Sequence, residues 1–167
     1  ARDGLFNPAV RNGWTLGQRS RITDRTRVFS ESQYLKESAR GESGISHTFG
    51  VDLLPAPGWN IGLTIMDAEL DAIRGAVHRR AYGISAGRTD PRVQWASKLE
   101  YRRDSGAEQR DQWVTTNRLM WRVNEDWRVA LRANHARTRD RLGAYDETEL
   151  SEVNLGFAWR PHGGTRW

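Results

Sequence analysis

Apolar and polar residues alternate along most of this chain, with the period of two that is typical of a β-strand with two unlike faces. The alternation is clearest near the C-terminal end, where polar or small residues separate Val153, Leu155, Phe157 and Trp159. Residues 49–53, 59–65 and 127–133 repeat the pattern. It predicts an all-β fold in which one face of a sheet is apolar and the other is polar or small.

Two kinds of connection break this alternation and take turns along the chain. Short segments rich in turn-forming residues occur at positions 23–25, 55–58, 89–91, 124–126 and 161–164. Longer, more charged segments lie between them at positions 37–44, 70–77, 104–111 and 138–148. Residues 67–74 also carry a helix-compatible pattern, but it lasts barely two turns, and we assign it to a loop.

The repeating unit is therefore a β-hairpin, and the chain is predicted to form an up-and-down antiparallel sheet of about nine strands. The expected strands lie at residues 13–22, 26–37, 44–54, 59–69, 77–88, 92–103, 111–123, 127–138 and 148–160.

The aromatic residues are sorted both by face and by type of connection. Those beside the short turns are Trp59, Trp95, Trp121, Trp127 and Trp159. Those at the opposite strand ends are Trp14, Tyr34, Tyr82, Tyr101 and Trp113. Two aromatic rows that border an apolar band, with short turns on one side and longer loops on the other, match a transmembrane β-barrel of the bacterial outer membrane. The expected partner of the apolar face is then the lipid bilayer, and the short turns face the periplasm.

Some residues do not fit this assignment. Four polar residues fall on the expected lipid face, namely Ser97, Thr115, Asn117 and His135. An amide in hydrocarbon is costly unless it is paired, so we expect a bulge near Asn117 to shift the parity. The first two strands alternate weakly, with polar residues at the apolar positions 18, 20, 30 and 32.

The polar face carries most of the candidate chemistry. We expect the following charged residues to line the lumen: Lys98, Glu100, Arg102, Arg118, Arg122, Arg128, Arg132, Glu152 and Arg160. They would form charge ladders in a narrow barrel or a cationic wall in a wide one.

Charge and composition narrow the remaining classes of protein. The formal net charge is +5, but the arginines are spread along the chain among acidic residues, which argues against a nucleic-acid partner. The sequence has no cysteine, so it forms neither a disulfide nor a thiolate metal site. No stretch approaches the roughly 18 to 20 apolar residues of a membrane-spanning helix.

No catalytic or cofactor-binding motif is present. The histidines, His47, His78, His135 and His162, lie on different elements. The acidic positions 67, 69 and 71, and also 146, 147 and 149, lack the ordered spacing of a calcium loop, so we interpret them as solvated charge. Ser46 and His47 are adjacent on a strand and would point to opposite faces, so they cannot act together. We expect a protein without catalytic residues, metal or cofactor.

Three segments resemble the C-terminal barrel region of large bacterial outer-membrane surface proteins, which carry repeat domains ahead of a barrel. They are HTFGVDLLPAPGWNIG at residues 47–62, SAGRTDPRVQWASKLEYRRDSGAEQRDQWVTTNRLMWRVNEDWRVA at 85–130, and ETELSEVNLGFAWRP at 147–161. The resemblance covers roughly residues 12–161 and rests on strand and turn patterns.

The resemblance implies a membrane anchor or surface-display domain, with passive permeation as a further role. We treat residues 1–167 as a single barrel segment, with residues 1–12 poorly defined. Closed bacterial barrels normally have an even number of strands, so an odd count predicts an incomplete barrel that is continued by further strands or domains of the same polypeptide. The alternative from another class is a soluble, arginine-rich β-sheet module that binds a polyanion.

Overall fold

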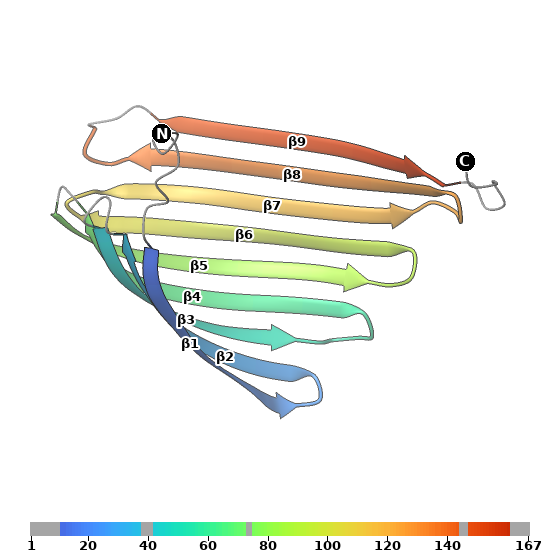
Figure 1. The fold of residues 1–167 in the computed structure, drawn as a ribbon, viewed down its shortest axis with the longest axis horizontal. Coiled ribbons are helices and arrows are strands. Elements are labelled where there is room, and N and C mark those ends of the chain that lie inside the picture. The colour runs from blue at the N-terminus through green and yellow to red at the C-terminus, as the bar shows by residue number, and fades with distance from the viewer. Residues whose placement is uncertain (1–10, 38–41, 73–74, 144–146, 161–167) are drawn as a thin grey trace, which may run out of the picture.

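The computed structural model describes residues 11–37, 42–72, 75–143 and 147–160. They form one sheet of nine antiparallel strands whose spatial order is the chain order (Figure 1). The strands are β1 (Arg11–Thr23), β2 (Thr26–Glu37), β3 (Glu42–Leu53), β4 (Trp59–Ala72), β5 (Gly75–Thr89), β6 (Val93–Gly106), β7 (Arg110–Arg122), β8 (Trp127–Asp140) and β9 (Thr148–Trp159). This confirms the predicted all-β, up-and-down arrangement and every predicted strand to within a few residues.

The sheet is open, because β1 and β9 pair only with β2 and β8 and not with each other. With nine strands in an up-and-down order, β1 and β9 run in the same direction. These two edges therefore cannot close on each other as an antiparallel pair. The described residues contain no helix of the length and apolarity needed to cross a membrane.

The predicted difference in connection length is wrong at two of the four charged connections. Strand β4 continues to Ala72 and β5 begins at Gly75, and β6 continues to Gly106 with β7 beginning at Arg110. The turn at residues 24–25 is as short as the β4–β5 connection, and the turns at 54–58, 90–92 and 123–126 are no shorter than either of these two connections. The charged residues that we assigned to loops extend the strands instead, because ion pairs across neighbouring strands satisfy them.

Side chains of the short turns cap their own backbone. The Asp90 carboxylate accepts hydrogen bonds from the amides of Arg92 (2.9 Å) and Val93 (2.8 Å). Asn124 does the same for the amides of Asp126 and Trp127 at the next short turn. Asp and Asn favour such turns because their short side chains reach the amides two and three residues ahead.

The predicted bulge near Asn117 is also wrong. The register between β6 and β7 is continuous from Val93 to Asp104, and so is the register between β7 and β8. The register shift in the sheet lies between Arg21 and Thr23, beside the first turn.

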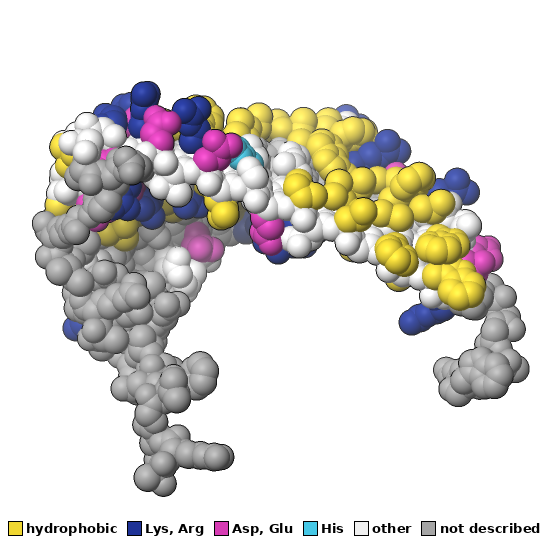
Figure 2. Space-filling model, turned by 90° about the horizontal axis from the view of Figure 1, so that it is seen from above, with side chains coloured by type: hydrophobic (Ala, Val, Ile, Leu, Met, Phe, Trp, Pro, Cys, Tyr) yellow, Lys and Arg dark blue, Asp and Glu magenta, His cyan; other side chains and the backbone are white. Residues whose placement is uncertain are grey.

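The sheet is a single curved layer without an apolar core. The buried hydrophobic side chains of the described residues are Ala68, Val77 and Ala81, and no large side chain is fully buried. Hydrophobic side chains gather instead along the outer side of the curved band (Figure 2). Glycines such as Gly50, Gly62 and Gly83 lie on the opposite face, where small residues leave room for the curvature.

Candidate functional site

The apolar face is exposed even on the central strands of the sheet. Leu63 and Ile65 on β4 are 48% and 56% exposed, and Ile84 on β5 is 49% exposed. The register places these three side chains next to one another on one face. A contiguous apolar surface of this kind marks a site of contact with a partner protein or a membrane.

All ten aromatic residues singled out from the sequence lie on this face, in two rows. In the row far from the short turns, Tyr82, Tyr101 and Trp113 are direct register partners, and the Tyr101 and Trp113 ring centroids are 4.8 Å apart. Trp14 and Tyr34 are register partners on β1 and β2, and their rings stack at the same end of the strands. Through the register Tyr34 lies level with Ile45 and Glu69, four positions beyond Tyr82. The row beside the short turns contains ring contacts of Trp59 with Trp95 and of Trp127 with Trp159.

The spacing of the two rows sets the width of the apolar band. Trp113 and Trp121 border the band on the same strand and are eight positions apart. Eight residues span roughly 27 Å along an antiparallel strand. A strand tilt of about 35–45° reduces this to about 20 Å, close to the ~25 Å apolar belt of outer-membrane barrels.

Beyond the Tyr82–Trp113 row, the same face of the sheet carries ion-paired residues instead of apolar ones. Asp67 contacts His78 Nε2 (2.8 Å) and Arg80 Nε (3.2 Å), each across the β4–β5 pair. Asp111 accepts hydrogen bonds from Arg103 Nε and the Tyr101 hydroxyl, both at 3.0 Å. The carboxylates of Asp67 and Asp111 are therefore already paired with arginine side chains.

Glu147 forms a third group of ion pairs beyond the aromatic row. Its carboxylate lies 2.9 Å from both Arg137 Nη2 and Arg139 Nε. The hydrogen bond from Arg137 holds the pKa of the Glu147 carboxyl below its usual range. The apolar band thus ends in a charged rim on this side, whereas it ends directly at the turns on the other side.

Three of the four polar residues that interrupt the apolar face have hydrogen-bond partners on neighbouring strands. Ser97 donates a 2.6 Å hydrogen bond to Asn117 Oδ1, and Asn117 Nδ2 lies 3.5 Å from the Ala133 carbonyl oxygen. His135 Nδ1 lies 3.0 Å from Ser151 Oγ. These pairs account for polar residues that the sequence pattern left unexplained, without any change of parity.

Eight of the nine charged residues that we predicted on the polar face fall there by register, and Arg160 directly follows β9, outside the paired residues. One group forms a ladder. Glu100 pairs with Lys98 and Arg102, Arg102 Nη1 donates to Gln112 Oε1 (3.3 Å), and Gln112 Nε2 donates to Thr138 Oγ1 (2.9 Å). Arg79 adds a bidentate pair with the buried Asp104, at 2.7 and 2.8 Å. Glu152 accepts hydrogen bonds from Asn134 and Asn154.

The other group of these residues is cationic and unpaired. Arg118 lies directly opposite Arg132, and Arg122 lies directly opposite Arg128. In the part of the chain that the structure describes, none of these four guanidinium groups has an ion pair or hydrogen bond, and all four residues are exposed. Charge on the polar face is therefore balanced near the charged rim and unbalanced near the short turns.

The described residues hold no group of three or more histidine and acidic side chains that could bind a metal ion. His47 Nδ1 lies 2.9 Å from Ser32 Oγ on β2, on the face opposite to Ser46. His162 and Asp146 lie outside the described residues.

The chain matches no family model, no curated protein and no solved structure.

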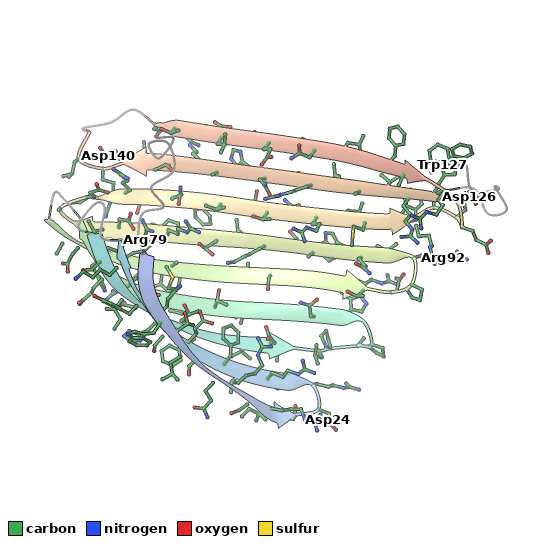
Figure 3. The ribbon with its side chains drawn as sticks, viewed as in Figure 1. Asp24, Arg79, Arg92, Asp126, Trp127 and Asp140 are labelled. Atoms are coloured by element: carbon green, nitrogen blue, oxygen red, sulfur yellow. The ribbon has the colours of Figure 1, made fainter. Side chains whose placement is uncertain are left out.

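A groove on the polar face was not predicted from the sequence. Arg92 and Gln94, at the β5–β6 turn, line a groove of about 540 Å³ together with Arg122 and Arg128. In Figure 3, Arg92 lies at the same end of the sheet as Asp126 and Trp127, and Arg79 and Asp140 lie at the other end. Alternation assigns each arginine to a face, but the groove depends on which residues are opposite each other, and a single strand does not reveal this register.

Proposed function

We propose that this chain is a segment of a bacterial outer-membrane β-barrel that anchors an attached surface domain in the membrane. The apolar face would contact lipid, and the polar face would line a water-filled or side-chain-filled lumen. The open edges of β1 and β9 would each pair with a further strand, supplied by the same polypeptide. Such a strand runs antiparallel to the edge that it joins.

The exposed apolar face carries this proposal. In a water-soluble sheet, large side chains such as Leu63, Ile65 and Ile84 would be covered by a second layer. The described part of the chain has no second layer, and its buried hydrophobic side chains are small. Lipid is the one solvent in which an exposed apolar band bordered by two aromatic rows is favourable.

The charged rim suggests the orientation. The strands extend beyond the Tyr82–Trp113 row with ion-paired residues, whereas the opposite row adjoins the turns directly. Outer-membrane barrels have their longer segments outside the cell and their short turns in the periplasm. We therefore assign the charged rim to the cell exterior.

Fractionation of the full-length protein tests the proposal. It is expected in the outer membrane, resistant to extraction by urea and by alkaline carbonate, with a gel mobility that changes on boiling. Recovery in the soluble fraction without detergent would contradict it.

A second candidate is a soluble β-sheet module that binds a polyanion through its arginines. The unpaired register partners Arg118–Arg132 and Arg122–Arg128 favour it. It leaves the apolar face without a partner, so we rank it second. Association with membranes separates the two candidates, because only the barrel requires lipid.

A further inference from the structure

The two arginine pairs lie on either side of a strip of uncharged residues. Met120, Ala130 and Gly156 are register neighbours between the pairs on the polar face of β7, β8 and β9. Arg118 and Arg122 are four positions apart, which corresponds to about 14 Å along the strand. Arginine side chains from both pairs can therefore extend toward each other over this strip.

Arranging like charges in this way is unfavourable for the sheet by itself. Residues directly opposite in an antiparallel pair have Cβ atoms only about 5 Å apart, and like charges there are destabilising. Toward the charged rim the cations of the same face are balanced: Arg79 pairs with Asp104, and Glu100 pairs with both Lys98 and Arg102. A bound anion would supply the missing negative charge.

Asp90 and Glu152 do not fill this role in the described structure. Asp90 lines the groove, but its carboxylate already contacts Arg88 Nε at 3.2 Å and two backbone amides. Glu152, on β9, has its two oxygens bonded to Asn134 and Asn154. Neither carboxylate lies within ion-pair distance of the four arginines.

We propose that this groove, lined by Arg92, Arg122 and Arg128 with Arg118 and Arg132 at its far side, binds a small soluble anion that carries two or more phosphate groups. Guanidinium groups bind phosphate with paired, charge-assisted hydrogen bonds. Two arginine pairs separated by an uncharged strip fit phosphate groups spaced along one molecule better than a single phosphate. The site lies on the face opposite the apolar band, which favours a dissolved anion over a lipid headgroup.

A small anion also fits the groove better than a nucleic acid does. The groove has a volume of about 540 Å³. Toward the charged rim, the unpaired cationic residues are followed by the ladder of Lys98, Glu100 and Arg102, in which the charges are paired. Nucleic acids bind along extended cationic tracks. The inference rests on the proposed function only in that the polar face is accessible to water.

Titration calorimetry with tripolyphosphate tests the site, using the folded full-length protein in detergent and orthophosphate as a weaker comparison. Wild type is expected to bind one tripolyphosphate per chain, with affinity that falls as salt rises. The double variant Arg122→Gln/Arg128→Gln should lose at least tenfold in affinity. Arg27→Gln, which removes an exposed arginine from the polar face of β2 outside the groove, should bind like wild type.

A second readout keeps the test decisive if the double variant is hard to fold. Arg122→Lys keeps the charge but loses the paired hydrogen bonds, and should bind with an affinity between those of wild type and the double variant. Without anion at low salt, Arg128→Gln should raise the thermal midpoint, because it removes a like-charge pair.

Several results would overturn the site: equal loss in Arg27→Gln, equal affinity for orthophosphate, or a single-stranded oligonucleotide that binds more tightly and competes. The same experiment separates this site from the proposed function. A protein that enters membranes but does not bind tripolyphosphate refutes the site alone. A protein that stays soluble without detergent and binds tripolyphosphate refutes the barrel alone.

Discussion

The ring of Phe29 lies directly over Gly50 on the neighbouring strand, on the polar face of the sheet. A Cβ atom added to Gly50 would come within 2.1 Å of the Phe29 ring, so only glycine fits beneath it. The Arg19 guanidinium lies 5.5 Å from the centroid of the same ring. An aromatic side chain thus covers the glycine backbone and fixes the register between β2 and β3 at a place where the alternation is weak.

Gly50→Ala should therefore destabilise the sheet by about 1–3 kcal/mol, because the ring must move away. Unfolding in urea measures the change. Gly17→Ala is the matched control on the same face, since its nearest neighbour would be 3.7 Å away. We expect that variant to be neutral or slightly more stable than wild type. Equal destabilisation by both changes would contradict the role assigned to Phe29.

The hydrogen bond between Ser97 and Asn117 provides a test of the apolar face. Asn117→Ala leaves the Ser97 hydroxyl without this partner in an apolar setting and should cost about 1–3 kcal/mol. The double variant Ser97→Ala/Asn117→Ala should cost less than the sum of the two single changes. Additive effects in a double-mutant cycle of urea unfolding would show that the pair is not coupled.

Acidification should destabilise the β5–β6 turn, which is capped by a carboxylate, but not the β7–β8 turn, which is capped by a neutral amide. Hydrogen bonds from the amides of Arg92 and Val93 hold the pKa of Asp90 below its usual range. The contribution of the Asp90 carboxylate is present above about pH 4, the ordinary aspartate value, and is lost as the pH falls through the lower folded-state pKa. Asn124 makes the equivalent bonds with a neutral amide.

Thermal unfolding of wild type and Asp90→Asn across pH 2–6 measures this difference. Asp90→Asn keeps an acceptor oxygen for both amides, so its midpoint should fall less than that of wild type below about pH 4. Asp90→Ala should be less stable than either at neutral pH. Parallel pH curves for wild type and Asp90→Asn would be inconsistent with a charged cap.

Epitope insertion tests the orientation of the proposed barrel. Gly143 follows β8 at the charged rim, and an added Cβ there would meet no atom within 4 Å, so the position tolerates an insertion. A tag at Gly143 should bind antibody on intact cells. A tag at Ala56, in the β3–β4 turn, should bind only after the outer membrane is opened. The opposite pattern would reverse the orientation.

Much of this fold follows from the sequence because alternation and turn chemistry are local. The strands on either side of Asp90 and Asn124 could be placed because these residues cap turns through amides two and three positions ahead. The lengths of the connections between strands could not be predicted from the sequence. Asp71 and Asp104 are indistinguishable from loop residues in the sequence, and only their partners on adjacent strands make them part of the sheet.

The candidate sites likewise have one part that the sequence predicts, the face of each residue, and one part that it does not, the residue that lies opposite. Parity assigns Trp113 and Arg132 to opposite faces, as the structure has them. It does not reveal that Arg132 lies opposite Arg118, or that Phe29 covers Gly50, because these relations depend on the register between strands. The groove at Arg92 was missed for that reason.

One substitution on each face of the sheet tests the central claim that the apolar face contacts lipid. Leu131 lies between Leu119 and Leu155 in the apolar band, and Thr48 lies on the polar face opposite Glu31. Folding of Leu131→Arg and Thr48→Arg into lipid vesicles is compared with that of wild type. We predict that Leu131→Arg loses about 2–4 kcal/mol of stability in the bilayer and that Thr48→Arg stays close to wild type. Equal stability of the two variants, or a larger loss in Thr48→Arg, would contradict a lipid-facing apolar band.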